Sequence, residues 1–242
     1  MKTFVVLLSI ALTGSLAKDL YNKSTRPVLG GLRSAATNQY TDLYDYTHQG
    51  GTRLRLSDYT PTLYNLNFDN RVSSLCVTGT WLIYGDENYN MNNVGGSNYW
   101  VYGDNYCTDV PSQFENQASS ARYTGAPDSW RADTLNLYLN EYFIGGEEYT
   151  YTDIANLKYN DQAKSVIVTG CSPWTLYESS NYYGRCLCVY PGSTQDCNPG
   201  FYTTESSLGS LARTISSARR GCYCNQKSFP DNYLSKEQQG FF

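Results

Sequence analysis

Four short polar segments recur along the chain, and their side chains carry oxygen atoms that could bind a cation. Residues 69–74 read Asp-Asn-Arg-Val-Ser-Ser, and residues 115–120 repeat them as Glu-Asn-Gln-Ala-Ser-Ser. Residues 160–165 keep two polar residues but place Lys164 before the final serine, and residues 212–217 keep only the two serines. Carboxylate, amide and hydroxyl oxygens are ligands of hard cations, and the same side chains also close turns on their own backbone. Both roles are open at this point.

The spacing of these segments indicates an internal repeat. Their final serines, Ser74, Ser120, Ser165 and Ser217, are 46, 45 and 52 residues apart. A period of this length is typical of one supersecondary unit that is used several times. We therefore predict four similar units along the chain.

Each unit also contains a hairpin pattern: an aromatic residue, a second aromatic five positions later, and glycine two positions after that. The pattern is complete in the third unit (Tyr138, Phe143, Gly145) and in the fourth (Tyr177, Tyr182, Gly184). Glycine is favoured there because a folded hairpin needs a positive φ. Gln49 replaces the second aromatic residue in the first unit, and Met91 replaces the glycine in the second. We expect these two hairpins to be looser, with Gly95-Gly96 as an alternative turn in the second.

The strand patterns predict an all-β protein. About four short strands in some 45 residues are typical of a Greek key. Four keys pair naturally into two β-sandwich domains. Small polar residues and Pro127 interrupt the pattern at residues 126–129. We therefore predict domains at 39–126 and 127–224, followed by a polar C-terminal tail at 225–242.

The first residues have the features of a secretory signal. Residues 1–17 contain Lys2, an apolar run too short to span a bilayer, and a small-residue cleavage pattern at residues 15–17. Residues 18–38 show no periodicity and are predicted to form an arm, with a glycosylation sequon at Asn22. No other segment approaches the roughly 20 apolar residues of a membrane helix. A secreted, unanchored protein is expected.

Cysteine usage agrees with secretion. All eight cysteines follow the predicted signal, and an even number in that context implies disulfides. Cys76 and Cys107 precede residue 127, whereas the other six follow it, so we expect pairing within each half. A zinc site is disfavoured because His48 is the only histidine. The pairing of the six remains open.

Other chemistry is poorly represented. The net charge is −4, and nucleic-acid binding requires clustered Lys and Arg side chains. His48, beside two glycines, is interpreted as a solvated turn residue, which leaves nucleophilic catalysis without a base. The carboxylate pairs Glu147-Glu148 and Asp86-Glu87 are interpreted as solvated loop charges. We predict that the protein is not an enzyme.

Taken together, the aromatic-glycine hairpin and the following polar segment resemble the motif of the βγ-crystallin superfamily. The resemblance covers residues 39–224, with four motifs in two domains. In that family the polar segment forms calcium sites, each built from loops of both motifs in a pair. The resemblance therefore implies Ca²⁺ ligands in the first domain: Asp69, Asn70, Ser73, Glu115, Asn116 and Ser119. Backbone carbonyls and water would complete the roughly six to eight oxygens that calcium takes.

The second domain matches the calcium motif less well. Lys164 places an ammonium where a hydroxyl is expected, and Ala212-Arg213 removes two oxygen donors, although Asp161 survives. We expect little calcium binding there and assign its stability to disulfides. The resulting hypothesis is a secreted, non-enzymatic, calcium-binding protein with a structural or matrix role. The alternative is a secreted recognition module, lectin-like, toxin or inhibitor, that binds an extracellular protein or glycan through exposed tyrosines, of which the chain has 24 in all, and through the disulfide-rich second domain.

Overall fold

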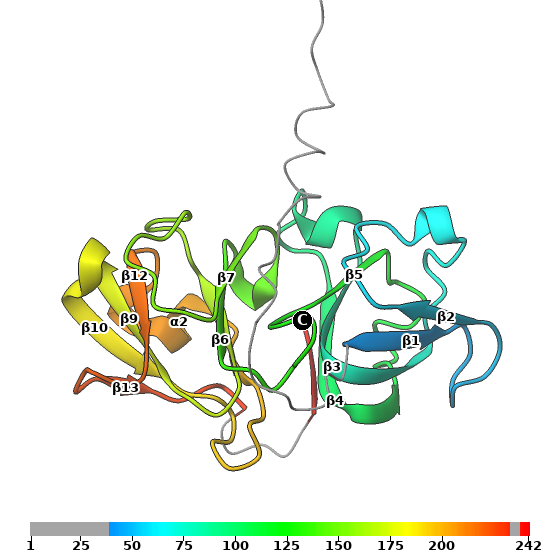
Figure 1. Cartoon of the computed structure of the whole chain (residues 1–242). Coiled ribbons are helices and arrows are strands. Elements are labelled where there is room, and N and C mark those ends of the chain that lie inside the picture. The colour runs from blue at the N-terminus through cyan, green and yellow to red at the C-terminus, as the bar shows by residue number, and fades with distance from the viewer. Residues whose placement is uncertain (1–38, 233–237) are drawn as a thin grey trace, which may run out of the picture. The chain divides into compact units, whose positions relative to one another are not determined.

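A computed structural model of the 242-residue chain describes residues 39–232 and 238–242. The predicted signal (1–17), the predicted arm (18–38) and the Asn22 sequon lie outside the described residues. Figure 1 shows the described part as strands joined by short loops and single helical turns. None of its helices is long and apolar enough to cross a bilayer.

The first half contains one antiparallel sheet. Its strands are β1 (Tyr40–Tyr44), β2 (Arg53–Leu56), β3 (Ser74–Tyr84), β4 (Asn98–Asp109) and β5 (Ser120–Tyr123). The order is β14-β4-β3-β1-β2, where β14 (Gln239–Phe241) comes from the end of the chain, and β5 also pairs with β3. The start of β3 pairs with β1 and its end pairs with β5, and a register shift near Gly79 separates the two parts. Side chains from both parts, such as Leu75 and Trp81, share one hydrophobic core.

The second half contains two antiparallel layers. The first sheet has the order β11-β8-β6-β7, and the second has the order β12-β9-β10 with β13 added in parallel to β10. The elements are β6 (Thr134–Tyr138), β7 (Glu147–Thr150), β8 (Ser165–Thr169), β9 (Trp174–Ser179), β10 (Tyr183–Val189), β11 (Gly200–Tyr202), α2 (Glu205–Leu208), β12 (Ser217–Arg220) and β13 (Lys227–Ser228). The layers enclose a second core that includes Leu137, Trp174 and Leu187.

Within each half, the two sequence units exchange strands. β11 belongs to the fourth unit but pairs with β8 of the third. In the first half, the end of β4 belongs to the second unit but pairs with the start of β3 in the first. This interlocking confirms the predicted fold class, two Greek-key β-sandwich domains. The boundary at residues 126–127 stays a prediction, and the sheets change between β5 and β6.

Three of the four hairpins have the same backbone conformation. Two adjacent residues have left-handed φ values, and the glycine two positions after the second of them is also left-handed, at Gly51, Gly145 and Gly184. The prediction of a looser first hairpin is wrong, because Gln49 adopts the required φ of 58° and Gly51 follows at 77°. The second hairpin does differ: its left-handed residues are 88–90, and Met91 returns to φ −57°. Gly96 closes a further turn in this loop, with its N–H donating to the Asn93 carbonyl (3.0 Å), and neither Gly95 nor Gly96 has a positive φ.

Four disulfides confirm the predicted partition of the cysteines. Cys76 pairs with Cys107 across β3 and β4. The other bonds lie within the second half: Cys171–Cys197, Cys186–Cys224 and Cys188–Cys222. The last two join β10 to the segment that follows β12, which the sequence had left open.

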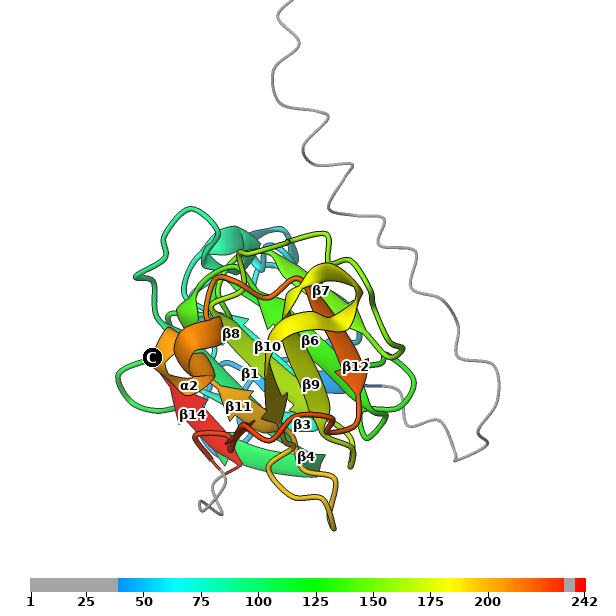
Figure 2. The ribbon, with the colours of Figure 1, turned by 90° about the vertical axis from the view of Figure 1, so that its left-hand side faces the viewer.

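The segment 225–242, interpreted from sequence as an aperiodic tail, contributes two strands. Residues 227–228 form β13 beside β10, and β14 (Gln239–Phe241) lies antiparallel to β4 of the first half. Figure 2 shows β14 beside β4. Strands this short carry too few residues for an alternating pattern, so the sequence could not indicate them.

Candidate functional site

The final serine of each polar segment fastens the hairpin of its own unit. The Ser74 hydroxyl donates to the carbonyl of Tyr46 (2.6 Å) and accepts from the backbone N–H of Gln49 (2.9 Å). Ser120, Ser165 and Ser217 make the same pair of bonds with the hairpins at 86–89, 140–143 and 179–182. Each of these four serines is the first residue of a strand, and its hydroxyl therefore holds the hairpin of its unit against the start of that strand.

The preceding serine has a different environment, which brings the two units of the first half together. The Ser73 hydroxyl lies 3.2 Å from the carbonyl oxygen of Asp45 and 3.3 Å from Oδ1 of Asn116. A cavity of about 520 Å³ opens at this point, and Glu115 lines it as well. Three of the six predicted ligands, Ser73, Glu115 and Asn116, are thus placed together across two segments that are 43 residues apart at Ser73 and Asn116.

The other three predicted ligands belong to a related arrangement. The backbone N–H of Asn116 donates to Val72, next to Ser73, and that of Asn70 donates to Ala118, next to Ser119; both distances are 2.9 Å. Asp69 and Asn70 therefore lie along Ser119 as Glu115 and Asn116 lie along Ser73. The six predicted ligands therefore form two groups, and each group combines residues from both polar segments.

A carboxylate oxygen in this second arrangement lacks a partner. Oδ2 of Asp69 accepts from the Asn70 amide (3.0 Å), whereas Oδ1 is buried and has no hydrogen-bond donor. Buried polar atoms usually have a hydrogen-bond partner, so a buried carboxylate oxygen without one is able to accept a further ligand. A hard cation fits this oxygen-rich environment. In the described ranges no three His, Cys, Asp or Glu side chains form a metal-binding cluster, so a metal here depends on amide, hydroxyl and backbone oxygens.

A guanidinium shares the cavity beside Ser73. Arg71 pairs with Asp45 at 2.5 Å and donates to the Asn67 carbonyl at 2.7 Å. Desolvation raises the pKa of Asp45, but hydrogen bonds from the Thr52 backbone and Arg71 outweigh it and leave that pKa below its ordinary value. Asp45 is therefore ionised, and Arg71 partly neutralises the cavity.

The second half repeats the arrangement at one of its two equivalent positions. The Ser216 hydroxyl lies 2.7 Å from the Glu178 carbonyl and 3.1 Å from Oδ1 of Asp161, as Ser73 does with Asp45 and Asn116. Asn160 stands beside Asp161 as Glu115 stands beside Asn116. The sequence analysis did not recognise this set, because it counted donors within each segment.

The two residues that replace oxygen donors in the second half, Lys164 and Arg213, both lie at the other of the two equivalent positions. The backbone N–H of Arg213 donates to Ala163, next to Lys164 (3.0 Å). The Lys164 ammonium donates to Oδ1 of Asn140 (3.2 Å), and Arg213 pairs with Glu205 (2.7 Å). Two protein cations thus replace the oxygen donors at one position, and the other position keeps its own.

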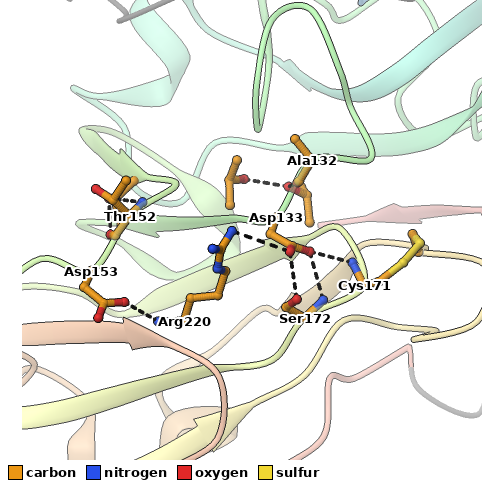
Figure 3. Close-up of polar contacts among 11 residues, drawn as sticks. Ala132, Asp133, Thr152, Asp153, Cys171, Ser172 and Arg220 are labelled. Atoms are coloured by element: carbon orange, nitrogen blue, oxygen red, sulfur yellow. Dashed lines mark hydrogen bonds and ion pairs between the residues drawn. A yellow bond between two sulfur atoms is a disulfide. The ribbon is translucent and has the colours of Figure 1, made fainter. Parts of the chain in front are cut away.

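The arginines of β12 are neutralised by carboxylates. Arg219 pairs with Asp153 (3.2 Å), and Figure 3 shows Asp153 also accepting from the Arg220 backbone. The Arg220 guanidinium points toward Asp133 (3.8 Å), whose carboxylate accepts from the Ser172 hydroxyl. With Arg213 paired to Glu205, this small basic cluster offers no free cationic stripe to a phosphate backbone.

The residues considered for catalysis have other roles. His48 is 86% exposed on its side chain and lies 3.5 Å from Asp109. The interpretation of Glu147 and Glu148 as solvated loop charges is wrong. Glu147 accepts from the hydroxyls of Tyr59 and Tyr138, and Glu148 accepts from two backbone N–H groups at residues 158–159. These contacts hold loops and do not form a carboxylate pair facing a cleft.

The tyrosines divide into packed and exposed groups. Those of the second and third hairpins and of the central strands are buried: Tyr84, Tyr89, Tyr99, Tyr102, Tyr123 and Tyr138. The most exposed are Tyr46 and Tyr64 in the first half and Tyr183 and Tyr223 in the second, at 61–72%. The buried rings therefore serve the cores, and the four most exposed rings face solvent.

Comparisons with solved structures find βγ-crystallins among the matches. Geodin, a βγ-crystallin from Geodia cydonium, is 20% identical; the match covers 76% of this chain and 99% of geodin, with a TM-score of 0.58. A βγ-crystallin from an archaeon is 27% identical over 37% of this chain and 98% of its own, with a TM-score of 0.32. Protein S, solved in complex with calcium, is 19% identical and covers 76% of this chain and 100% of its own, with a TM-score of 0.28.

In comparisons of the sequence, no family model matches and no curated protein gives a match. The geodin alignment spans nearly all of that protein and most of this chain, and it agrees with the paired Greek keys described above. The chain therefore has the βγ-crystallin fold.

Proposed function

We propose that this is a secreted, non-enzymatic protein of the βγ-crystallin type that binds calcium in its first half and has a structural or matrix role. The observation that carries the proposal is the pairing of polar segments across two units. Ser73 lies beside Asn116, and Asp69 keeps a buried oxygen without a donor. Those oxygens are of the kind that calcium prefers. The proposed ligands remain Asp69, Asn70, Ser73, Glu115, Asn116 and Ser119.

Calcium would supply a cross-link between two loops. Glu115 and Asn116 would hold it from one unit and Ser73 from the other, and Asp69, Asn70 and Ser119 would do so at the second position. An ion bound only by the folded chain stabilises that chain by mass action. The Arg71–Asp45 pair lowers the net negative charge of the first position, so we expect weak affinity, with Kd of about 10⁻⁴–10⁻³ M as in extracellular modules.

We extend the proposal to one position in the second half. Asp161 and Ser216 repeat the spacing of Asn116 and Ser73, with the Glu178 carbonyl in the place of Asp45. The chain would then bind three calcium ions, not two. The fourth position is excluded from the proposal because Lys164 and Arg213 place cations there.

Secretion is part of the same proposal. Four disulfides support an oxidising compartment, in which cystines persist. Calcium sites of extracellular modules commonly have affinities in the range of about 10⁻⁴–10⁻³ M. A weak calcium site is therefore consistent with an extracellular location.

Thermal unfolding of the whole chain tests the calcium proposal. Calcium at about one hundred times Kd should add about 2.7 kcal/mol for each site, and chelator should reverse the rise in Tm. The double variant Asn70→Ala/Asn116→Ala should lose most of the rise, whereas the exposed Asn225→Ala should keep it. Calorimetric titration should count three ions in the wild type and two in Asp161→Ala/Ser216→Ala. An unchanged Tm at 10 mM calcium would reject the proposal.

Recognition by exposed aromatic rings is the second candidate. Tyr183 and Tyr223 of the second half are 72% and 61% exposed, and the Arg219 guanidinium lies 4.7 Å from the Tyr223 ring centre. Rings of this kind bind glycans and proteins through their faces. Surface immobilisation on a glycan array, with Tyr183→Ala/Tyr223→Ala as the comparison, tests it. Signal that is lost in the variant favours recognition, and signal from neither protein opposes it.

A further inference from the structure

An arginine on the outer face of the second half is held between two tyrosine rings. Arg219 follows Ala218, which packs in the second core, and successive residues of a strand point to opposite faces. The Arg219 guanidinium lies 5.0 Å from the ring centre of Tyr182 and 4.7 Å from that of Tyr223. Its Nε donates to Asp153 at 3.2 Å, whereas its two terminal nitrogens donate to no residue of the described ranges. This arginine is therefore oriented by three neighbours and keeps one edge for a ligand.

The Tyr223 ring is 61% exposed, yet its position is fixed. The residue on each side of it forms a disulfide with β10. The Tyr223 N–H donates to the Thr175 hydroxyl at 2.9 Å. The ring also lies over Gly221, where an added Cβ would be 3.0–3.1 Å from three of its atoms. A ring that is fixed before a ligand arrives loses little conformational entropy on binding, which favours its use as a contact surface.

The unused edge of the guanidinium matches a planar anion. Two parallel N–H groups fit the two oxygens of a carboxylate. The Arg219 side chain is 39% exposed, so a ligand can reach it. Each oxygen of Asp153 already accepts one hydrogen bond, Oδ2 from Arg219 and Oδ1 from the Arg220 backbone (2.9 Å). The unused hydrogen-bonding groups of Arg219 are donors, so a ligand must supply acceptor oxygens.

The edge of β12 leaves little main chain for a peptide. Ala218 exchanges two backbone hydrogen bonds with Ile154, both 2.9 Å, and the Arg220 N–H donates to Asp153. A peptide that adds to a sheet gains its affinity from such main-chain groups, and these are already used, so a ligand must be held by side chains. The C–H face of a sugar ring packs on the negative face of an aromatic ring such as Tyr223. A sugar that carries a carboxylate therefore uses both the ring and the guanidinium.

We propose that Tyr182, Arg219 and Tyr223 form a binding site for an acidic glycan. The terminal nitrogens of Arg219 donate to the carboxylate of a uronate sugar, and the Tyr223 ring packs on the sugar itself. This site rests on the second candidate function, recognition by exposed rings, and gives that function a ligand class; it does not depend on calcium. The Asp153 carboxylate, which is bonded to Arg219, repels an anionic ligand and keeps the affinity modest.

Calorimetric titration of the whole chain, with chelator and at low salt, tests the site. The probe is an oligosaccharide of alternating glucuronate and N-acetylglucosamine, compared with the same oligosaccharide after its carboxylates are reduced to alcohols. The acidic form should bind saturably, and the reduced form at least about tenfold more weakly. Arg219→Lys, which keeps the charge but loses the fork, should weaken binding of the acidic form about tenfold. Arg131→Met is the matched control, because Arg131 also stacks on a ring (Trp130, 4.4 Å), and it should leave binding unchanged.

Asp153→Asn distinguishes a carboxylate ligand from a neutral one. Removal of the negative charge should tighten binding of the acidic form about threefold and leave the reduced form unaffected, and a gain of affinity cannot come from a misfolded variant. Equal binding of the two forms that is lost in Tyr223→Ala would overturn the carboxylate site and leave recognition by exposed rings in place. No binding of either form, or tighter binding of a glutamate-rich peptide, would overturn the acidic-glycan site.

Discussion

Arg122 on β5 is a fully buried cation that joins the two halves. Its guanidinium donates to the Tyr84 hydroxyl (3.0 Å) and to the carbonyls of Gly145 (2.9 Å) and Phe143 (2.8 Å) in the second half. Its charge also lies 4.7–5.2 Å from the ring centres of three tyrosines, Tyr84, Tyr89 and Tyr138. Burial raises the pKa of Tyr84 and of Tyr138, so both phenols stay neutral around the guanidinium.

Replacement by methionine keeps much of the volume and removes the donors. The carbonyl of Phe143 still accepts from the Tyr84 hydroxyl (2.7 Å) in the variant, whereas the carbonyl of Gly145 loses the hydrogen bond from Arg122. An unsatisfied buried carbonyl costs about 1–3 kcal/mol, and desolvated cation–π contacts contribute about 2 kcal/mol. The half-buried Glu147 also attracts the guanidinium electrostatically, without a hydrogen bond between them among those described. We expect Arg122→Met to destabilise the chain by about 3 kcal/mol.

Urea unfolding followed by tryptophan fluorescence measures this loss. Arg131 is the matched control, because its guanidinium is exposed and stacks on Trp130 at 4.4 Å; Arg131→Met should change the free energy of unfolding by less than about 1 kcal/mol. Because Arg122 bonds across the two halves, its loss should also separate their unfolding into two transitions. A change below about 1 kcal/mol with a single transition would falsify this account of Arg122.

Two more predictions concern single contacts. Ser165→Ala removes the hydroxyl that fastens the third hairpin and should lower the free energy of unfolding by about 1–3 kcal/mol in urea, whereas the outward-facing Ser112→Ala should be neutral; equal effects would contradict the tie. The Arg185 side chain hydrogen-bonds Glu178 and lowers its pKa to about 2. This pair contributes stability that is fully present above the ordinary pKa of the carboxyl, 4.5, and is lost as the pH falls toward 2. Carboxyl chemical shifts in an NMR titration should show the low pKa, and Arg185→Met should return it toward 4.5; an unchanged pKa in that variant would exclude Arg185 as the cause.

The repeat was visible in the sequence because each unit must solve the same local problem. A folded hairpin needs left-handed residues and a glycine, and its strand needs a hydroxyl that bonds the turn. Those requirements fix residue types at fixed distances, as at Gly145 and Ser165. All-β class, four units and separate pairing of the cysteines follow from such local rules. The first hairpin was not predicted correctly, because Gln49 adopts a left-handed φ that a glutamine in the sequence does not indicate.

The sequence did not determine which residues that are far apart in the chain come into contact. The polar segments alternate partners, so Asp161 meets Ser216 and Lys164 lies near Arg213. The segment at residues 160–165 therefore contributes Asp161 to a position that keeps its oxygen donors and Lys164 to a position that has lost them. A count of the donors within that segment could not separate the two positions. Strand exchange between units decides which donors face each other, and no local pattern records it.

The same reason explains Arg122 and β14. The residues around Arg122 come from two sheets and a loop of the other half, so neither the burial of the cation nor its partners could be read from its neighbours in the chain. Residues 238–242 have no periodicity of their own and become a strand because the β4 edge offers unpaired backbone groups and Trp100 a flat wall for Gly240. Composition and spacing determined the units of this protein. Only the tertiary structure determined how they interlock, because long-range packing energy is a property of surfaces that the chain brings together after its local elements have formed.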